Sequence, residues 1–70
     1  FVMQLDLHGI RHYQVDREVE NFVYLNQHAL PLTIICGNSH KMIELVTHAL
    51  ETIGCEISWP RYGTVIIRRL

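Results

Sequence analysis

The stretch LDLHGIRH, residues 5–12, carries side chains that could handle a phosphate group or a proton. Asp6 and His8 alternate with leucines, so both should point to the same side of a strand that stops at Gly9. A carboxylate can act as a general base or bind a divalent cation, and an imidazole can act as an acid or donate a hydrogen bond to phosphate. Asp6 and His8 are therefore the candidate catalytic residues, although a solvated strand face carries polar side chains in many proteins without any such role.

A second group of candidates lies in CGNSHK, residues 36–41. A glycine turn followed by capping residues leaves amides exposed at the start of a helix, and such amides bind phosphate or carboxylate. Lys41 would add a positive charge in the first helical turn. Spacing alone favours the plainer explanation, in which Gly37 and Asn38 only form the turn and the cap.

The residues that we expect to contact nucleic acid come from these two stretches and from cations around the polar sheet face: Gly9, Arg11, His12, Gly37, Asn38, Ser39, His40, Lys41, Arg61 and Arg68. Tyr13 or Tyr62 could stack on an unpaired base, whereas Trp59 shares the strand parity of Ile57 and is predicted to be core. The net charge of −1 means that any basic patch must be local, so the salt dependence of binding should be shallow.

Hydrophobic periodicity predicts the elements that position these residues. Alternating or β-branched runs predict strands over residues 2–7, 32–36, 55–59 and 64–69, with a turn over residues 60–63. Apolar residues at helical spacing predict amphipathic helices over residues 12–27 and from a cap at Asn38 or Ser39 to residue 53, where Gly54 ends the second helix in the left-handed conformation.

The order βαβαββ predicts an α/β fold. Right-handed helical crossovers make the first three strands parallel, and the hairpin makes the last strand antiparallel. Since one face of the alternating strands is polar, both helices should cover the other face. We therefore expect a single domain over residues 1–70, a two-layer sandwich of a mixed four-stranded sheet with two helices on one face. The ends of its parallel strands should bring the two candidate loops side by side.

Composition excludes several classes of protein. No apolar run approaches the roughly 18 residues of a membrane span, and no secretory signal is present. Two cysteines are too few for a disulfide scaffold, which favours a reducing, cytoplasmic location. A zinc site from His8, His12, Cys36 and His40 is an alternative, but it lacks paired-cysteine spacing. A disulfide between Cys36 and Cys55 is disfavoured, because the predicted topology separates them by more than the ~7 Å limit between Cα atoms.

The pattern resembles the Smr (small MutS-related) domain family over nearly the whole chain, from Leu5 to about Arg69, and is most similar to its short stand-alone members. The resemblance is carried by LDLHG, by an apolar strand that runs into a glycine loop, and by the closing GTVII strand. It implies a fold like that of the carboxyl-terminal domain of bacterial translation initiation factor three, with nucleic-acid binding and, in several members, DNA nicking or RNA endonuclease activity. The first family motif falls on residues 5–9. The second, His-Gly-x-Gly, falls on residues 36–39 and keeps only its first glycine.

Because Cys36 and Ser39 replace a histidine and a glycine of that motif, binding of DNA or RNA is easier to carry over than cleavage. A cleaving domain with Asp6 as its single carboxylate would use one Mg²⁺ or Mn²⁺ ion, or no metal. The alternative from another class is a module for protein interaction or homo-oligomerisation without catalysis. It would use the uncovered sheet face, where Ile35 and Ile66 lie among polar residues.

Overall fold

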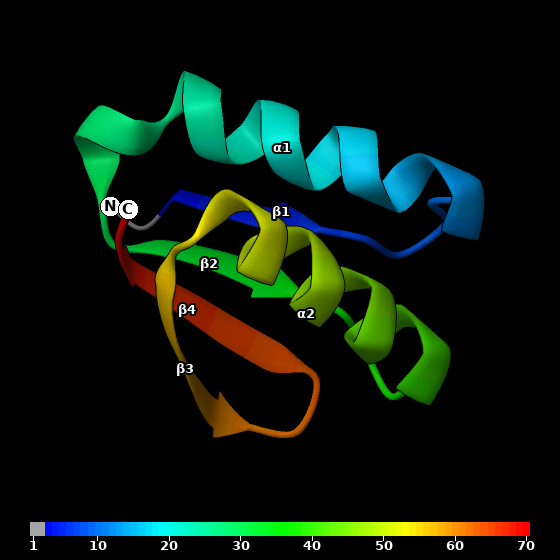
Figure 1. The fold of residues 1–70 in the computed structure, drawn as a ribbon. Helices are drawn as coiled ribbons and strands as arrows, with labels where there is room; N and C mark the ends of the chain where they lie inside the picture. Colours follow the sequence, from blue (N-terminus) through cyan, green and yellow to red (C-terminus); the bar gives the residue numbers. More distant parts are fainter. Residues whose placement is uncertain (1–2) are drawn as a thin grey trace.

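Four strands form one mixed sheet in the order β1-β2-β4-β3 (Figure 1). The computed structural model describes residues 3–70, so Val2, where we expected the first strand to begin, lies outside the described residues. The strands are β1 (Met3–Asp6), β2 (Leu32–Ile35), β3 (Glu56–Arg61) and β4 (Thr64–Arg69). β1 pairs with β2 in parallel, whereas β4 is antiparallel to both of its neighbours, β2 and β3. The first three strands therefore run in one direction, as predicted.

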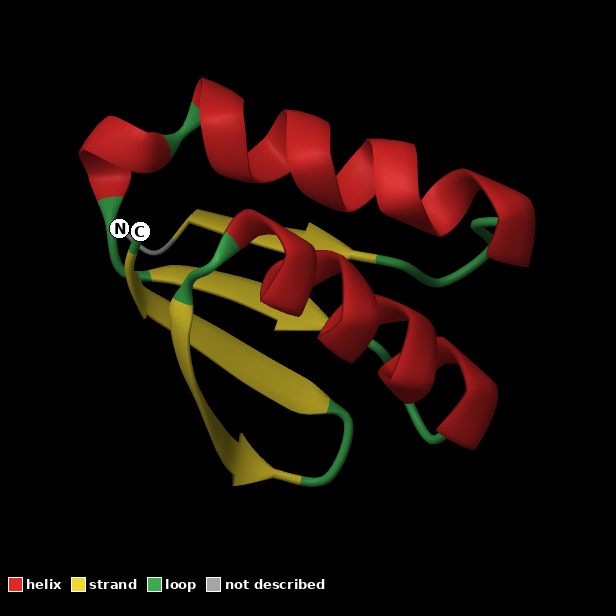
Figure 2. Cartoon of the chain, viewed as in Figure 1, coloured by secondary structure: helices red, strands yellow, loops and turns green. Residues whose placement is uncertain are grey.

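Two helices, α1 (Val15–Leu25) and α2 (His40–Ile53), lie side by side on the same face of the sheet (Figure 2). Each helix has one apolar stripe, and the stripes meet the covered face of the sheet in a core of fully buried side chains. The largest of these are Leu7, Leu32, Ile34, Leu50, Ile67, Val15, Val19, Val23, Val46 and Val65. The predicted α/β sandwich is confirmed. None of the helices among residues 3–70 has the length and apolar character needed to span a bilayer.

The first helix is shorter than the predicted span of residues 12–27. A 3-10 turn, η1 (His12–Gln14), precedes α1, and the backbone N–H of Arg11 donates to Oε1 of Gln14 across it at 3.3 Å. At the other end, the Asn26 side chain donates to the Phe22 carbonyl at 2.8 Å and closes the last turn, before a second 3-10 turn, η2 (Gln27–Ala29). Polar side chains thus bind the backbone at both ends of α1, and periodicity alone does not show them.

The hairpin differs from the prediction at Pro60. Residues 60 and 61 belong to β3, and the turn consists only of Tyr62 and Gly63. Proline is tolerated in β3 because this strand lies at the edge of the sheet, where one side of the backbone has no ladder partner. The tighter turn carries Arg61 to the end of the paired strands.

Trp59 is not the core residue that strand parity predicts, because its side chain is 37 % exposed. The pairing of β3 with β4 shifts register between Ser58 and Arg61, so two residues, Trp59 and Pro60, face one residue of β4. Such a bulge breaks the in-out alternation of a strand. Alternation therefore predicts the orientation of Ile57 correctly and fails two residues later.

Candidate nucleic-acid interface

Three connections meet at one end of the sheet: the β1–α1 loop (residues 7–11), the β2–α2 loop (residues 36–39) and the β3–β4 turn (residues 62–63) (Figure 1). The Leu7 N–H donates to the Ile35 carbonyl at 3.0 Å and joins the first two connections. The Cys36 N–H donates to the Gly63 carbonyl at 2.7 Å and joins the last two. We call this region, with the strand ends and helix starts that flank it, the loop end.

Gly63 fixes the third connection against the second. It has a φ of +84°, and a Cβ atom built on it would collide with the backbone carbonyl of Gly37. A side chain at this position would therefore push the two connections apart. The sequence shows Gly63 only as a turn residue, so its contact with Gly37 was not predicted.

Asp6 and His8 both lie exposed at the loop end, as predicted. The Asp6 carboxylate accepts a hydrogen bond from the His8 backbone N–H at 2.9 Å. The turn that follows is closed by the Ile10 N–H, which donates to the Leu7 carbonyl at 3.0 Å, and it needs the positive φ of Gly9, +84°. Within residues 3–70 the structure has no hydrogen bond between the Asp6 carboxylate and the His8 imidazole. The observed role of Asp6 is therefore to shape the loop that presents His8.

The β2–α2 loop has the predicted turn and cap. Gly37 takes a φ of +76°, and Ser39, rather than Asn38, caps α2, since its Oγ accepts from the Met42 N–H at 3.2 Å. Asn38 is left exposed beside the turn. Lys41 is exposed in the first turn of α2, where we expected it.

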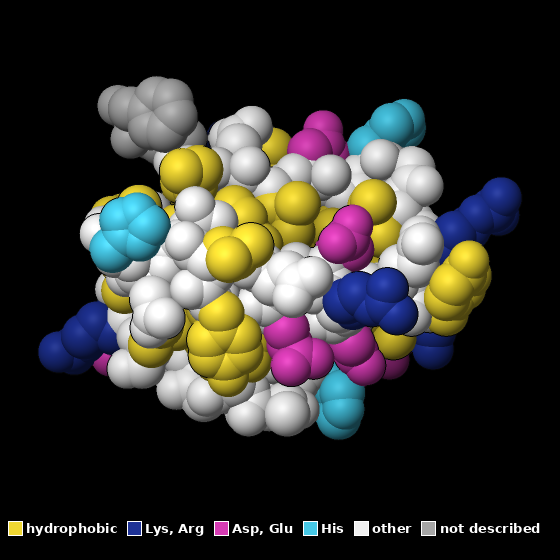
Figure 3. Space-filling model, turned by 90° about the horizontal axis from the view of Figure 1, so that it is seen from above, with side chains coloured by type: hydrophobic (Ala, Val, Ile, Leu, Met, Phe, Trp, Pro, Cys, Tyr) yellow, Lys and Arg dark blue, Asp and Glu magenta, His cyan; other side chains and the backbone are white. Residues whose placement is uncertain are grey.

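Positive charge gathers at the loop end. Arg11, Lys41 and Arg61 are exposed there, together with the imidazoles of His8, His12 and His40. These are three of the six Lys and Arg residues of the chain and three of its five histidines. In Figure 3, Lys and Arg side chains project from the end of the molecule that carries the β1–α1 loop and also from the opposite end.

Acidic side chains at the loop end come from the elements that flank the connections, and two of them, Asp16 and Glu18, lie in the first turn of α1. The three connections contain no Asp or Glu, and Asp6 stands at the end of β1. Glu44, one turn into α2, lies 3.5 Å from the Nε2 of His40, an i,i+4 pair that sequence reasoning overlooked. Both side chains of this pair are mostly exposed, so its contribution to stability is small.

Arg68 does not belong to this region. It lies near the carboxyl end of β4, at the opposite end of the sheet, and its Nε donates to the Ser58 Oγ at 3.2 Å. The prediction placed Arg68 on the polar sheet face but did not separate the two ends of that face. Of the ten predicted contact residues, Arg68 is the one that the fold carries away from the others.

The residues at the loop end do not form a metal site. Among residues 3–70, no three His, Cys, Asp or Glu side chains are arranged to hold a metal ion, so the candidate zinc ligands are not brought together. Asp6 is the only carboxylate that the strand ends and connections supply, which does not fit a resident Mg²⁺ or Mn²⁺ ion either. Cys36 and Cys55 are unpaired thiols. Burial raises the pKa of Cys36 to about 11, so this thiol stays protonated near neutral pH and is a poor metal ligand or nucleophile.

An open hollow of about 570 Å³ lies on the surface beside the β1–α1 loop. It is lined by Gly9, Ile10, Arg11, His12 and Tyr13. Tyr13 is 84 % exposed, the most exposed large hydrophobic side chain of the described residues, and Tyr62 in the β3–β4 turn is 63 % exposed. Both aromatic side chains thus stand at the loop end beside its cations. The sequence raised both tyrosines as stacking residues, but it gave no sign of the hollow.

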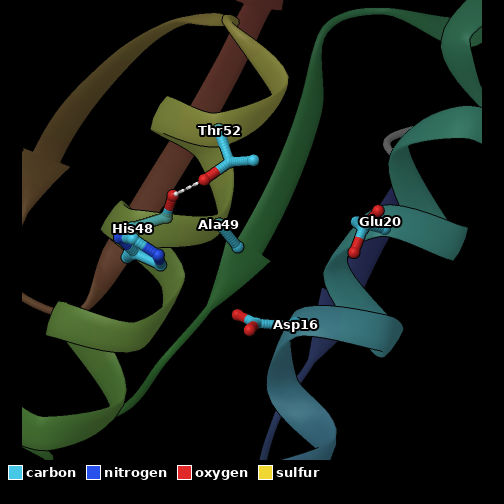
Figure 4. A pocket seen from close by; sticks show the side chains of 5 residues that line it. All are labelled: Asp16, Glu20, His48, Ala49 and Thr52. Atoms are coloured by element: carbon cyan, nitrogen blue, oxygen red, sulfur yellow. Dashed lines mark hydrogen bonds between the residues drawn. The ribbon is translucent and has the colours of Figure 1, made fainter.

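A second hollow, of about 140 Å³, lies between the helices. It is lined by Asp16 and Glu20 of α1 and by His48, Ala49 and Thr52 of α2 (Figure 4). The Thr52 hydroxyl donates to the His48 carbonyl at 3.0 Å, and the Asp16 carboxylate points across the groove toward α2. Since two carboxylates line this groove, the helical face is unfavourable for a polyanion.

The uncovered sheet face offers little continuous apolar surface. Ile35 and Ile66 are both half-buried, and the residues directly opposite them on the paired strands are threonines: Thr64 faces Ile35, and Thr33 faces Ile66. Polar groups therefore interrupt the surface that a protein-interaction module would need.

Comparison with protein-family models, with curated proteins and with solved structures gives no match to this chain.

Proposed function

We propose that this chain is a nucleic-acid-binding domain of the Smr type that contacts the phosphodiester backbone of DNA or RNA through the loop end. The proposal is supported chiefly by two backbone hydrogen bonds, Leu7 to Ile35 and Cys36 to Gly63, because together they hold the segments that carry Arg11, Lys41 and Arg61 at one end of the sheet. Cations held on a rigid framework gain affinity for a polyanion by displacing its counterions.

The remaining groups of the loop end suit phosphate contacts. The exposed side chains of Asn38 and His8 can donate hydrogen bonds to phosphate oxygens, and the glycines at positions 9 and 37 leave space for a strand to approach the backbone. With about three phosphates neutralised, the slope of log K against log salt should be about −2 to −3. Affinity should accordingly be modest.

Binding is the proposed primary function, and hydrolysis is a secondary one that would depend on Asp6. Hydrolysis without a resident metal needs a base that takes a proton from the attacking water and an acid that gives a proton to the leaving oxygen. Asp6 and His8 would supply these roles, but the carboxylate already accepts the His8 N–H. We therefore expect at most slow cleavage. We also propose a cytoplasmic location, which the two unpaired thiols support.

Gel-shift and cleavage assays on single-stranded, duplex and branched substrates, with and without Mg²⁺ or Mn²⁺, test both functions. Asp6→Asn is the informative variant, since an amide oxygen can still accept the His8 N–H but cannot act as a base. We expect Asp6→Asn to bind like the wild type and to lose any cleavage, whereas Asp6→Ala should also weaken binding because its loop loosens. Failure of the wild type to bind any substrate would refute the proposed function. Nucleic-acid binding that persists unchanged in high salt would contradict phosphate contacts by the cations of the loop end.

A further inference from the structure

We infer that the loop end takes an unpaired strand, whose bases stack on Tyr13 and Tyr62 while its phosphates meet the cations between them. This inference rests on the proposed function and specifies its substrate class. The argument begins with exposure: a tyrosine that is 84 % exposed contributes little to the core, and water contact of its ring is unfavourable. At Tyr13 the ring borders a hollow large enough for a flat ligand, with Arg11 and His12 on the same lining.

The second tyrosine, Tyr62, lies in a different connection, the β3–β4 turn. Tyr62 precedes Gly63, whose backbone packs directly against that of Gly37. This contact also fixes the backbone position of Tyr62. Tyr62 directly follows β3, and Tyr13 lies in η1, after the loop that leaves β1; β1 and β3 are the two edge strands of the sheet. At a spacing of about 4.8 Å between neighbouring strands, these edges are on the order of 14 Å apart.

Between the two edges lie the β2–α2 loop, with the exposed Asn38, and the first turn of α2, with Lys41. An extended strand that crosses from one tyrosine to the other would therefore pass over groups that can contact its phosphates. Aromatic side chains beside a positive track are the usual means of binding single strands without strong sequence preference, since every base has a face that can stack. In a duplex those faces are already stacked, so the tyrosines would have nothing to contact.

Two probes of equal length separate the stacking from the charge: a short oligothymidylate and an abasic strand with the same number of phosphates. We expect the wild-type chain to bind the oligothymidylate about 5- to 150-fold more tightly than the abasic strand, the range that one stacked base gives. Tyr13→Ala should remove the share of one stacked base from this difference, leaving the share of Tyr62, while affinity for the abasic strand stays unchanged. Tyr13→Phe, which keeps the ring, should retain the preference.

Tyr24→Ala is the matched control. Tyr24 is also an exposed tyrosine, at 53 %, but it lies at the far end of α1, away from the loop end. The Tyr24→Ala substitution should leave the affinity for both probes, the oligothymidylate and the abasic strand, unchanged. Equal binding of both probes by the wild type, or an equal loss in Tyr24→Ala and Tyr13→Ala, would overturn the stacking inference and leave the proposed function standing. If the wild type binds neither probe, the inference fails, and the duplex and branched substrates of the gel-shift assay then decide the proposed function.

Discussion

Gly63 lies with its backbone directly against the backbone of Gly37, so that no side chain fits between the hairpin turn and the loop that starts α2. This contact joins two segments that are far apart in the sequence. It determines how the cations of β3 and α2 are placed relative to each other, and four consequences of the loop-end geometry can be tested.

Substitution of Gly63 should be much more damaging than substitution of another glycine with positive φ. We expect Gly63→Ala to lower the free energy of unfolding by about 2 to 4 kcal/mol, since it combines left-handed strain of about 1 to 2 kcal/mol with a backbone collision. Gly54 has a φ of +88° and open space around it, so Gly54→Ala should cost only the strain. Urea unfolding of the two variants measures the difference, and equal losses would contradict the proposed contact.

The cations of the loop end should contribute individually to the salt dependence of binding. Arg11→Gln, Lys41→Gln and Arg61→Gln should each weaken binding to a single strand and reduce the salt slope by about 1. Arg68→Gln is the control, because Arg68 lies at the opposite end of the sheet. Titrations at several salt concentrations provide the slopes. If Arg68→Gln lost as much affinity as the other three variants, the interface would not be confined to the loop end.

Two substitutions of Ser39 distinguish its effect on stability from its effect on nucleic-acid binding. Ser39→Ala removes the hydroxyl that accepts the Met42 N–H and should cost about 1 kcal/mol of stability. Ser39→Asp restores a capping oxygen, and its charge suits the helix start, so its stability should equal or exceed that of the wild type. The same charge should repel phosphate and weaken nucleic-acid binding. If Ser39→Asp bound as tightly as the wild type, phosphate would not approach this loop.

The buried thiol of Cys36 should make stability fall at alkaline pH. Burial raises its pKa from 9.0 to about 11, so the unfolded chain loses this proton at a lower pH than the folded chain. Stability from this group is fully present below about pH 9 and is lost as the pH rises toward 11, by about 2 to 3 kcal/mol at most. Cys36→Ala should remove this part of the pH dependence. Denaturant unfolding of both proteins between about pH 8 and pH 11 tests it, and identical pH profiles would contradict it.

Much of the fold follows from periodicity, because apolar side chains must face the single core of so short a chain. The buried stripe of α1, the Ser39 cap and the left-handed Gly54 are all visible in the sequence. Periodicity fails at Trp59, where the bulge in β3 breaks the alternation that would bury the ring. The alternation of apolar and polar residues does not show where an edge strand contains a bulge.

The candidate site was predictable in its residues but not in its assembly. Asp6 and His8 could be placed at one strand end from alternation, and Lys41 at the start of a helix from the cap before it. The separation of Arg68 from Arg61 depends on which end of β4 each residue approaches, and the hollow beside Tyr13 depends on how the 3-10 turn curls. Both are properties of three-dimensional packing.

The irregularity of β3 also affects how the protein behaves at high concentration. An edge strand with free N–H and C=O groups can pair with a strand of another molecule, and this is a common start of aggregation. In β3 the proline removes one donor and the bulge twists the backbone, while the opposite edge, β1, is only four residues long. Neither edge of the sheet is a good template for intermolecular pairing. Replacing Pro60 by a β-branched residue should therefore make the protein aggregate sooner at high concentration.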